Sequence, residues 1–298
     1  MDIFQLSAGK PKNSEIPINL QNITFNKSII KWQVETLKSA FENFSLTVLV
    51  GFRSELYKLK IKNVKYYKIS KWENNSILDT FLSIPFNQKS FICHYSDTIF
   101  SKNVFKEIKL YKEDLIFAVD TNWEKRFFNR PILDKKIAEK IKIHSTKTAI
   151  HNVEFCGLIF FKHNVAKYIK ENKNKIKGKT LIDLVKHLKK NGFSTNYYDA
   201  KNNWTELNYP NDLSKFILST KSQTLKNLKS FLKKSYIGNQ ISFTVSDWEI
   251  NKDKIINNIK KTFKQNIIVR SSSLSEDQFT GSKAGEYLSL PNINPNIE

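Results

Sequence analysis

The run 46–50 (LTVLV) constrains the fold of this chain most strongly, because it is continuously apolar and stops at Gly51. Such a run is typical of a β-strand that is buried on both faces, as in a parallel sheet. The segment before it, 28–41, repeats apolar residues at helical spacing, and another apolar run precedes that segment. The order strand, helix, strand predicts an α/β fold at the start of the chain.

A glycine turn at 6–11 (LSAGKP) follows the first apolar run. A glycine turn after a strand lets backbone N–H groups approach a phosphate chain, and a lysine beside the turn can neutralise phosphate charge. An ordinary strand-to-loop turn can have the same composition, so the motif by itself leaves both interpretations open. Its spacing from polar residues later in the chain favours a ligand site.

Oxygen-bearing side chains mark two later strands. Asp97 comes soon after the apolar run 91–95, and ligands and metals bind at the carboxyl ends of α/β strands. A turn or helix cap is the alternative role for Asp97. Glu206 and Asn208 alternate with Leu207, so on a strand they would project from one face and could hold a hard cation such as Mg²⁺.

Two further polar groups have a binding and a structural interpretation. Arg126 and Arg130 follow the apolar strand predicted at 115–119. Near Trp123 they suit bidentate recognition of phosphate or carboxylate, and surface pairing with Asp is the routine alternative. The cluster 73–76 (ENNS) precedes a short helical pattern, and capping of that helix is the more common role of such a cluster.

The excess of 49 Lys and Arg over 28 Asp and Glu gives a formal net charge of +21. Clustered cations would suit nucleic acid or an anionic membrane surface. Here the lysines are spread over nearly every segment, so we interpret them as a solvated basic surface and expect no specific nucleic-acid site. Anionic nucleotide substrates are compatible with this charge.

Two cysteines, Cys93 and Cys156, form neither a CxxC pair nor a metal-binding spacing. Their use predicts a reducing, cytoplasmic setting, with both as small buried side chains. No uninterrupted apolar run reaches the length of about 18 residues that spans a membrane. We therefore expect a soluble protein without a membrane partner.

The length of 298 residues suits about two domains, and the composition changes at about Ser219. The elements predicted beyond it are a helix at 220–234, a strand at 241–245, a helix at 252–263 and a strand at 267–269. The last strand enters 270–287, where serines and glycines surround Arg270. This composition after a strand suits the cradling of a phosphate.

Residues 1–218 resemble the sugar-phosphate and phosphocholine-type nucleotidyltransferases of GT-A fold, whose Rossmann-like mixed sheet is flanked by helices. The matching pieces are LSAGKP (6–11), SIIKWQVETL (28–37), LTVLVG (46–51), KWENNS (71–76), YSD (95–97), EFCG (154–157) and WTELNYPNDL (204–213). The segments DTNWEKRFFNR (120–130) and AEK (138–140) are similar to the cytidylyltransferase branch. Each piece is short, and their order and spacing make the resemblance specific.

The resemblance implies in-line transfer of a nucleotide to a phosphate oxygen, with Mg²⁺ as cofactor. It implies Lys10 and Asp97 as catalytic residues, and Asp97, Glu206 and Asn208 as metal ligands. The implied nucleotide-binding residues are Leu6, Ser7, Ala8, Gly9, Lys12, Asn75 and Ser76. The implied acceptor-binding residues are Trp123, Arg126, Arg130 and Glu154. This chain departs from the family where Lys10 and Pro11 replace a second glycine and an arginine, and where Asn208 replaces Asp.

Residues 219–298 resemble the beginning of the ATP-grasp-type nucleotide-binding domain of phosphoenolpyruvate synthase and pyruvate phosphate dikinase. The motif VRSSSLSED (269–277) followed by SKAG (282–285) carries this resemblance. It implies a partial α+β segment with a phosphate site at Arg270, Glu276 and Lys283. Only the first part of such a domain is matched, so we expect a truncated kinase domain whose remainder belongs to the full-length protein.

Together the two resemblances predict an enzyme that transfers CMP from CTP to a small phosphorylated acceptor and releases pyrophosphate. L-Glutamine phosphate, in the biosynthesis of a capsular phosphoramidate, is the first choice of acceptor. Phosphocholine or a sugar phosphate is the alternative. A kinase-side nucleotide binder with a degenerate transferase part is the alternative from another class. The sequence contains no residue that selects glutamine.

Overall fold

The computed structural model describes the chain except for residues 12–13, 25–26, 128–134, 137, 145–149, 202, 208–211, 213–220, 230–234, 273–276, 279–280, 283–287 and 297–298. The chain divides into two compact units, 1–212 and 213–298. The boundary that we predict after residue 218 falls within 213–220, outside the described residues.

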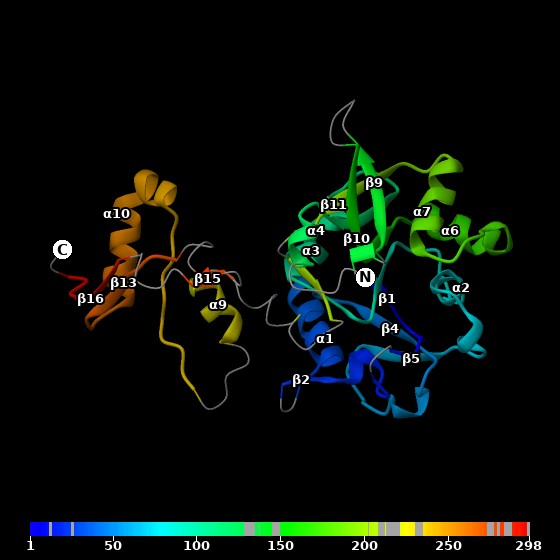
Figure 1. The fold of residues 1–298 in the computed structure, drawn as a ribbon, viewed down its shortest axis with the longest axis horizontal. Helices are drawn as coiled ribbons and strands as arrows, with labels where there is room; N and C mark the ends of the chain where they lie inside the picture. The colour runs from blue at the N-terminus through cyan, green and yellow to red at the C-terminus, as the bar shows by residue number, and fades with distance from the viewer. Residues whose placement is uncertain are drawn as a thin grey trace. The chain divides into compact units, whose positions relative to one another are not determined.

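The first unit is built on a mixed sheet of eight strands, drawn as arrows in Figure 1. Seven of them follow one another in the order β11-β8-β10-β6-β1-β4-β5, and β9 pairs with β10. The strands are β1 (Asp2–Ser7), β4 (Ser45–Val50), β5 (Val64–Lys68), β6 (Phe91–Tyr95), β8 (Leu115–Asp120), β9 (Lys140–His144), β10 (Ile150–Phe161) and β11 (Thr195–Asp199).

Most neighbours in this sheet are parallel, and β10 is the strand that reverses the direction. β1 lies between β4 and β6 and is parallel to both, which agrees with its buried apolar residues. β6 and β8 are each antiparallel to β10, so they run in the same direction as each other. The carboxyl ends of β1, β4, β6 and β8 therefore meet at one edge of the sheet.

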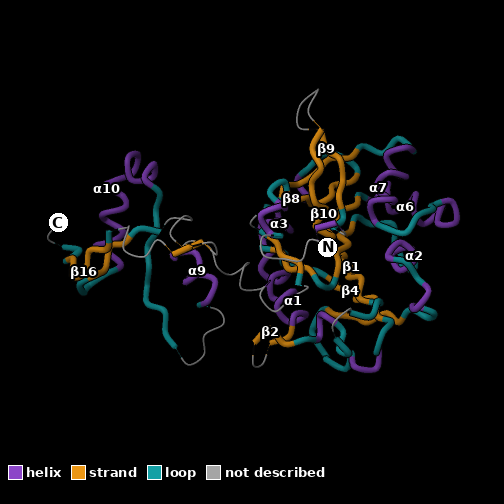
Figure 2. The backbone as a smooth tube through the Cα atoms, in the orientation of Figure 1, coloured by secondary structure: helices purple, strands orange, loops and turns teal. Residues whose placement is uncertain are grey.

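Helices cover both faces of the sheet, as Figures 1 and 2 show. The helices of this unit are α1 (Ile29–Ala40), α2 (Ile77–Leu82), α3 (Lys102–Glu107), α4 (Trp123–Arg126), α6 (His163–Asn172) and α7 (Leu181–Lys190). Alternate residues of β1 enter different cores, since Ile3 packs in the cluster that contains α1 and α3, whereas Phe4 packs in the cluster of α2, α6 and α7. The α/β fold with a mixed sheet between helices is confirmed.

Short elements complete the first unit. The 3₁₀ helices are η1 (Ile18–Leu20), η2 (Ser54–Leu56), η3 (Trp72–Asn74), η4 (Ile108–Leu110) and η5 (Lys173–Lys175). Strand β2 (Asn22–Thr24) pairs with β3 (Lys27–Ser28), and β7 (Thr98–Phe100) pairs with β12 (Trp204–Glu206). The β7–β12 pair matters most for the site, because it joins segments about a hundred residues apart in the sequence.

The described residues of the second unit form two helices and two small antiparallel sheets. Its elements are α9 (Lys221–Leu228), α10 (Val245–Thr262), β13 (Ile267–Arg270) paired with β16 (Ser289–Ile293), and β14 (Asp277–Gln278) paired with β15 (Gly281–Ser282). The strand predicted at 241–245 is wrong: residues 241–244 are coil and Val245 begins α10. The Thr244 hydroxyl accepts from the Asp247 amide at 3.0 Å, so a capping box overrides the local apolar pattern. In the part of the chain that is described, no helix combines the length and the apolar character needed to cross a membrane.

Candidate active site

Several of the predicted site residues lie at the edge where the parallel strands of the first unit end. The glycine turn follows β1, and Asp97 follows β6, the strand beside it. The Ser96 amide donates to the Leu6 carbonyl at 3.1 Å, which ties the two strand ends together. Glu154 reaches the same edge from the antiparallel strand β10, where it pairs with Asp120, the last residue of β8.

The glycine turn is held from beneath by buried side chains. Ser7 and Ala8 are buried, whereas Gly9 is exposed and a Cβ built on it would meet no atom within 4 Å. The Ala8 carbonyl accepts from the Phe52 amide at 2.8 Å, and a Cβ at Gly51 would lie 2.7 Å from that carbonyl and 2.5 Å from Trp72. Gly51 is therefore the glycine that packing requires here, and the space above Gly9 is open to a ligand.

Lys10 stands at the exposed end of this turn. Its Nζ lies 2.9 Å from a Glu15 carboxylate oxygen and 5.5 Å from the centre of the Phe52 ring. The lysine lowers the pKa of the Glu15 carboxyl through this bond and its charge. Ion pairs as exposed as this one contribute little to stability, so Lys10 can exchange Glu15 for another anion at little cost. Lys12, the other lysine predicted for the triphosphate, lies outside the described residues.

Asp97 and Glu206 are brought together by the β7–β12 pair. Glu206 pairs with Thr98, and the Leu207 amide donates to the Asp97 carbonyl at 2.8 Å. Both acidic residues are half-buried. Asn208, predicted to project beside Glu206, lies outside the described residues. The structure thus places two carboxylate residues on adjacent backbone at the predicted strand edge.

Asp120 fixes the start of β12 against the end of β8. One carboxylate oxygen accepts from the Trp204 indole nitrogen at 3.0 Å, and the other accepts from the Asn122 amide at 2.7 Å. Asp120 and Trp204 are both buried. Because its hydrogen bonds are directed at the protein, Asp120 serves to position Glu206, two residues after Trp204, at the site.

A tyrosine and a glutamate that our sequence analysis did not assign lie at the same edge. The Tyr95 hydroxyl donates to Glu139 at 2.9 Å, and the Glu139 carbonyl accepts from the Phe155 amide at 2.8 Å. Burial raises the pKa of the Glu139 carboxyl, and the negative charge of Glu206 acts in the same direction. Burial, Glu139 and Asp97 all raise the pKa of Tyr95, so its hydroxyl stays protonated and acts as the donor.

Gly157 makes room for the Tyr95 ring. Its φ is +75°, and a Cβ at this position would lie 2.4 Å from the ring. The register between β10 and β8 shifts between Phe155 and Ile159, around this glycine. The group that approaches Gly157 closely is thus an aromatic side chain.

The residues predicted for the acceptor are described in part. Trp123 is buried, and its indole nitrogen donates to the Asn152 carbonyl at 3.1 Å, so it braces the β9–β10 hairpin. Lys140 lies against its ring, 5.3 Å from the ring centre. Glu154 is buried at the strand edge. Arg126 ends α4, but its side chain lies outside the described residues, as does all of Arg130.

Asn75 and Ser76 lie where η3 leads into α2. The Ser76 hydroxyl accepts from the Asp79 amide at 3.1 Å and donates to the Asp79 carboxylate at 2.6 Å. The capping role that we kept as the alternative for this cluster is therefore present. Both residues are half-buried, and the Asn75 amide donates to the Trp72 carbonyl at 3.1 Å.

The donor set suits a metal ion that arrives with a nucleotide. Among the described residues, no group of three or more His, Cys, Asp or Glu side chains could hold a metal ion. Asp97 and Glu206 supply two carboxylates from neighbouring strands. Mg²⁺ is commonly held by one or two carboxylates together with substrate phosphates and water, and this is the set of ligands that the edge could complete.

Comparisons with known proteins concern the fold of the first unit. No family model matches the chain. It is similar to the structures of the inositol-1-phosphate CTP transferase from T. maritima (TM-score 0.54, 19% identity, 76% of this chain and 96% of that chain) and of the CTP:phosphocholine cytidylyltransferase from Streptococcus pneumoniae (TM-score 0.52, 15% identity, 72% of this chain and 96% of that chain). The first unit has the nucleotidyltransferase fold.

A curated protein is also similar to part of this chain. The chain is 29% identical over 132 residues to the CTP:phosphoglutamine cytidylyltransferase of Campylobacter jejuni, and the match covers 40% of this chain and 50% of that protein. The matched part is thus about half the length of the curated relative.

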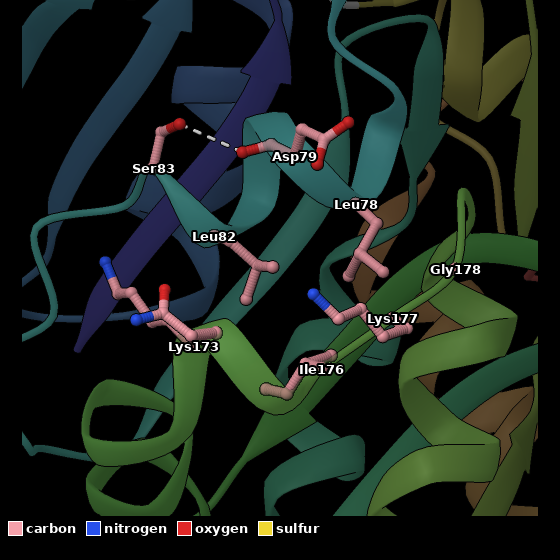
Figure 3. Close-up of a pocket in the computed structure, with 9 residues that line it drawn as sticks. Leu78, Asp79, Leu82, Ser83, Lys173, Ile176, Lys177 and Gly178 are labelled. Carbon is pink, nitrogen blue, oxygen red and sulfur yellow. Dashed lines mark hydrogen bonds between the residues drawn. The ribbon is translucent and has the colours of Figure 1, made fainter.

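A hollow of about 380 Å³ lies elsewhere on the nucleotidyltransferase unit, between α2 and the segment that joins η5 to α7 (Figure 3). Lys173 and Lys177 line it together with apolar residues. The Lys173 ammonium donates to the Ile84 carbonyl at 3.2 Å, and Asp79 is engaged in the cap of α2. The hollow contains none of the predicted site residues.

The phosphate site predicted in the second unit is described only at Arg270, the last residue of β13. Arg270 is exposed and pairs with Ser289 of β16. Glu276 and Lys283 lie outside the described residues. The ATP-grasp resemblance of this unit stays a prediction.

Proposed function

We propose that this chain is a cytidylyltransferase that transfers CMP from CTP to a small phosphorylated acceptor. The observation that carries the proposal is the meeting, at one strand edge, of the glycine turn, the Asp97–Glu206 pair and the buried Glu154. The nucleotidyltransferase fold supports the reaction type. Similarity to a curated cytidylyltransferase supports the choice of CTP.

The reaction needs positioning more than covalent chemistry from the protein. A phosphate oxygen of the acceptor attacks the α-phosphorus of CTP, a new P–O bond forms, the bond to the β-phosphate breaks, and pyrophosphate leaves. The new product is a diphosphate that links CMP to the acceptor. Negative charge accumulates on the oxygens of the leaving pyrophosphate. The chain must therefore hold the acceptor phosphate and the α-phosphate of CTP in line at a rigid strand edge.

The glycine turn would bind CTP through its backbone. The Ser7 hydroxyl is bonded to the buried Tyr57 hydroxyl at 2.7 Å, so it faces inward and leaves the backbone N–H groups of the turn for the nucleotide. Gly9 has open space above it, and Lys10 would leave Glu15 to neutralise the triphosphate. Only a weak surface ion pair opposes this exchange.

Asp97 and Glu206 would hold a Mg²⁺ ion, with Asn208 as a further oxygen donor. When bound, the ion would neutralise charge on the α-phosphate and on the departing pyrophosphate. The protein's part is to hold the two carboxylates in place. The β7–β12 pair does this for Glu206, and the turn that the Leu207 amide contacts does it for Asp97.

The acceptor remains a choice among small phosphorylated molecules. We favour L-glutamine phosphate, since the curated relative is a phosphoglutamine cytidylyltransferase. The structural neighbour named for phosphocholine keeps that acceptor as the second candidate. Glu154, Trp123, Arg126 and Arg130 would contact the acceptor.

We further propose that the second unit is the start of an ATP-grasp-type kinase domain that phosphorylates the acceptor before its activation with CMP. The sequence VRSSSLSED at the end of β13 supports this. Two consecutive steps on one molecule would suit cytoplasmic synthesis of a capsular phosphoramidate. A kinase-side nucleotide binder with an inactive transferase part is the competing interpretation, and it predicts phosphorylation without pyrophosphate release from CTP.

The test is a pyrophosphate-release screen of CTP, UTP, ATP and GTP against phosphoglutamine, phosphocholine, aminoethylphosphonate and sugar phosphates, with Mg²⁺ present or chelated. We expect release only with CTP, Mg²⁺ and an acceptor, and most rapidly with phosphoglutamine. Turnover only with a sugar phosphate would contradict the choice of acceptor. No release with any pair would contradict the transferase itself.

The Asp97→Asn variant tests the site directly. It removes a charge at the edge with little change of shape, so we expect turnover to fall by about 10²- to 10³-fold with the fold intact. The matched control is Asp114→Asn, just before β8. The Asp114 carboxylate accepts from the Ser194 backbone amide at 2.9 Å and from the Asn164 side-chain amide at 2.7 Å. The control should lose about 1–2 kcal/mol of stability and keep its turnover. Equal turnover in Asp97→Asn and wild type would contradict the site.

A further inference from the structure

Five polar side chains are buried beneath the candidate site and have no part in the proposed transfer. Gln5 lies on β1, Asn19 on η1 and Gln33 on α1, and Ser7 and Tyr57 lie beside them. Gln5 and Asn19 have no exposed surface. A buried amide costs free energy unless its hydrogen bonds are made, so the partners of these groups must be accounted for.

The five side chains form one continuous relay of hydrogen bonds. Ser7 bonds to Tyr57 at 2.7 Å, and Tyr57 donates to Asn19 at 2.7 Å. Asn19 donates to Gln5 at 2.8 Å, and Gln5 donates to Gln33 at 2.9 Å. Gln33 then donates to two backbone carbonyls, those of Ser96 at 3.0 Å and Thr98 at 2.8 Å. The relay therefore begins at the glycine turn and ends on both sides of Asp97.

The two carbonyls at its end fix the direction of every bond in the relay. A carbonyl accepts only, so the Gln33 NH₂ group must face the 96–98 turn and its oxygen must accept from Gln5. By the same reasoning, the Asn19 NH₂ group donates to the Gln5 oxygen, and the Asn19 oxygen accepts from the Tyr57 hydroxyl. Burial raises the pKa of Tyr57 to about 12, so its hydroxyl keeps the proton that it donates. Because Tyr57 has one proton, Ser7 must donate to Tyr57, and the relay has a single arrangement.

A relay of this kind transmits a constraint between its ends. The Gln33 amide uses both of its N–H groups on the 96–98 turn, so the turn cannot shift without breaking a buried hydrogen bond. The other end holds Ser7, whose backbone begins the glycine turn. The triphosphate-binding turn and the carboxylate that follows β6 are thus held in register by side chains that touch neither ligand.

We propose that Gln33 is a positioning residue that holds the turn carrying Asp97 in its productive position relative to the glycine turn. The inference rests on the proposed transferase function for its effect on turnover. Its claim about the turn itself is independent of any ligand. Gln33 acts through Asp97 and is not a catalytic residue.

Hydrogen exchange tests the holding of the turn without reference to activity. In Gln33→Met, which keeps the length of the side chain and removes its donors, the amides of 96–100 should exchange at least about tenfold faster than in wild type. The matched control is Leu37→Ala, one turn later on the buried face of α1, which weakens the helix packing at a side chain that cannot hydrogen-bond to the turn. We expect its 96–100 amides to exchange as in wild type under native conditions. Equal exchange of the turn in Gln33→Met and Leu37→Ala would overturn the inference.

Kinetics distinguish the two ends of the relay. Gln33→Met should lower kcat by about 10- to 100-fold and change KM for CTP by less than about threefold, because Asp97, the group that it misplaces, acts in the transition state. Gln33→Glu keeps the acceptor for Gln5 and loses both donors, so it should be at least as slow. Tyr57→Phe cuts the relay at the glycine turn and should raise KM for CTP by about three- to tenfold with a nearly unchanged kcat.

The control for Tyr57→Phe is Tyr66→Phe. Tyr66 packs against Tyr57 and donates to the Leu59 carbonyl at 3.1 Å, outside the relay. The Tyr66→Phe variant should leave kcat and KM for CTP within about twofold of wild type. A wild-type kcat in Gln33→Met would overturn the inference, even with a loosened turn. An inactive wild-type enzyme would instead refute the proposed function, and the exchange of 96–100 would still decide whether Gln33 holds the turn.

Discussion

Two segments of this chain follow a β-strand and have the composition of a phosphate-binding turn, but they are supported very differently. The turn after β1 grows from a strand that is buried between two parallel neighbours, and Ser7 beneath it is hydrogen-bonded into the core. The segment after β13 grows from a strand of a two-stranded sheet, where Ile268 is 64% exposed. Helix α10 contains no buried residue.

The comparison distinguishes a segment whose composition alone suits phosphate binding from one whose backbone is also held in position by the protein. The first segment is held by described contacts within its own unit, so its N–H groups are placed before any ligand arrives. In the second unit, apolar residues of β13 and β16 are exposed among the described residues. The difference in packing between the two preceding strands, β1 with its neighbours and β13, can be tested by substitution.

Paired truncations of isoleucine should show the largest difference. Ile92 on β6 is fully buried beside the site, whereas Ile268 on β13 is largely exposed. We expect Ile92→Ala to lower the free energy of unfolding by about 3–4 kcal/mol, and Ile268→Ala to change it by less than about 0.5 kcal/mol. Urea unfolding followed by tryptophan fluorescence measures both units, because four tryptophans lie in the first unit and Trp248 lies in the second. Similar losses in both variants would mean that β13 is as well packed as β6.

The second prediction isolates the contact between Gly157 and Tyr95. Gly157 and Gly192 both have positive φ, but a Cβ at Gly192 would meet no atom within 4 Å. Gly192→Ala should therefore cost about 1 kcal/mol for backbone strain alone. Gly157→Ala adds a clash with the Tyr95 ring and should cost about 3 kcal/mol in total. Thermal unfolding measures both.

A second substitution assigns the excess in Gly157→Ala to the ring. In Tyr95→Ala the ring is absent, so adding Gly157→Ala to it should cost only the strain that Gly192→Ala reports. Equal costs of Gly157→Ala in the presence and absence of the Tyr95 ring would show that the clash does not explain the effect. The Tyr95–Glu139 bond would then have no role in placing this glycine.

The strands and the position of Asp97 could be predicted because their signals are local. The runs 46–50, 91–95 and 115–119 are mostly apolar, as is typical of strands covered on both faces, and the structure contains strands at all three. Asp97 follows one of them, so its place at the sheet edge follows from the parallel order. The meeting of Asp97 with Glu206 came from resemblance to a family, since no local pattern pairs β7 with β12.

The support of the site could not be predicted, because its signals are not local. Gln5 interrupts an apolar strand and Gln33 interrupts the apolar face of a helix, and in the sequence each looks like a polar residue at a tolerant position. Their burial is explained by partners 14 to 65 residues away. Glu139 lies in the AEK segment that resembles a cytidylyltransferase, but its bond to Tyr95 depends on the way β9 and β10 pair.

The smallest expected effect on stability comes from His94, which tests whether water reaches the core beneath the site. It lies on β6 with almost no exposed surface, and its Nδ1 bonds to the Tyr95 carbonyl at 2.8 Å while its Nε2 has no hydrogen-bond partner among the described residues. Phe100 and Phe105 pack against the ring. Burial lowers the pKa of His94 to about 4, against the smaller opposing effect of its bond to the carbonyl.

The sign of the pH effect follows from this lowered pKa. Between about pH 6.5 and 4 the unfolded chain takes up a proton at His94 and the folded chain does not, so stability that is present above pH 6.5 is lost as the pH falls. From pH 7 to pH 5 this group should remove about 2 kcal/mol from the free energy of unfolding. Urea unfolding of wild type and His94→Leu at both values isolates the contribution, because the other titrating groups are shared. Parallel losses in the two proteins would mean that water reaches the imidazole in the folded state, and that the core under β6 is less sealed than its packing indicates.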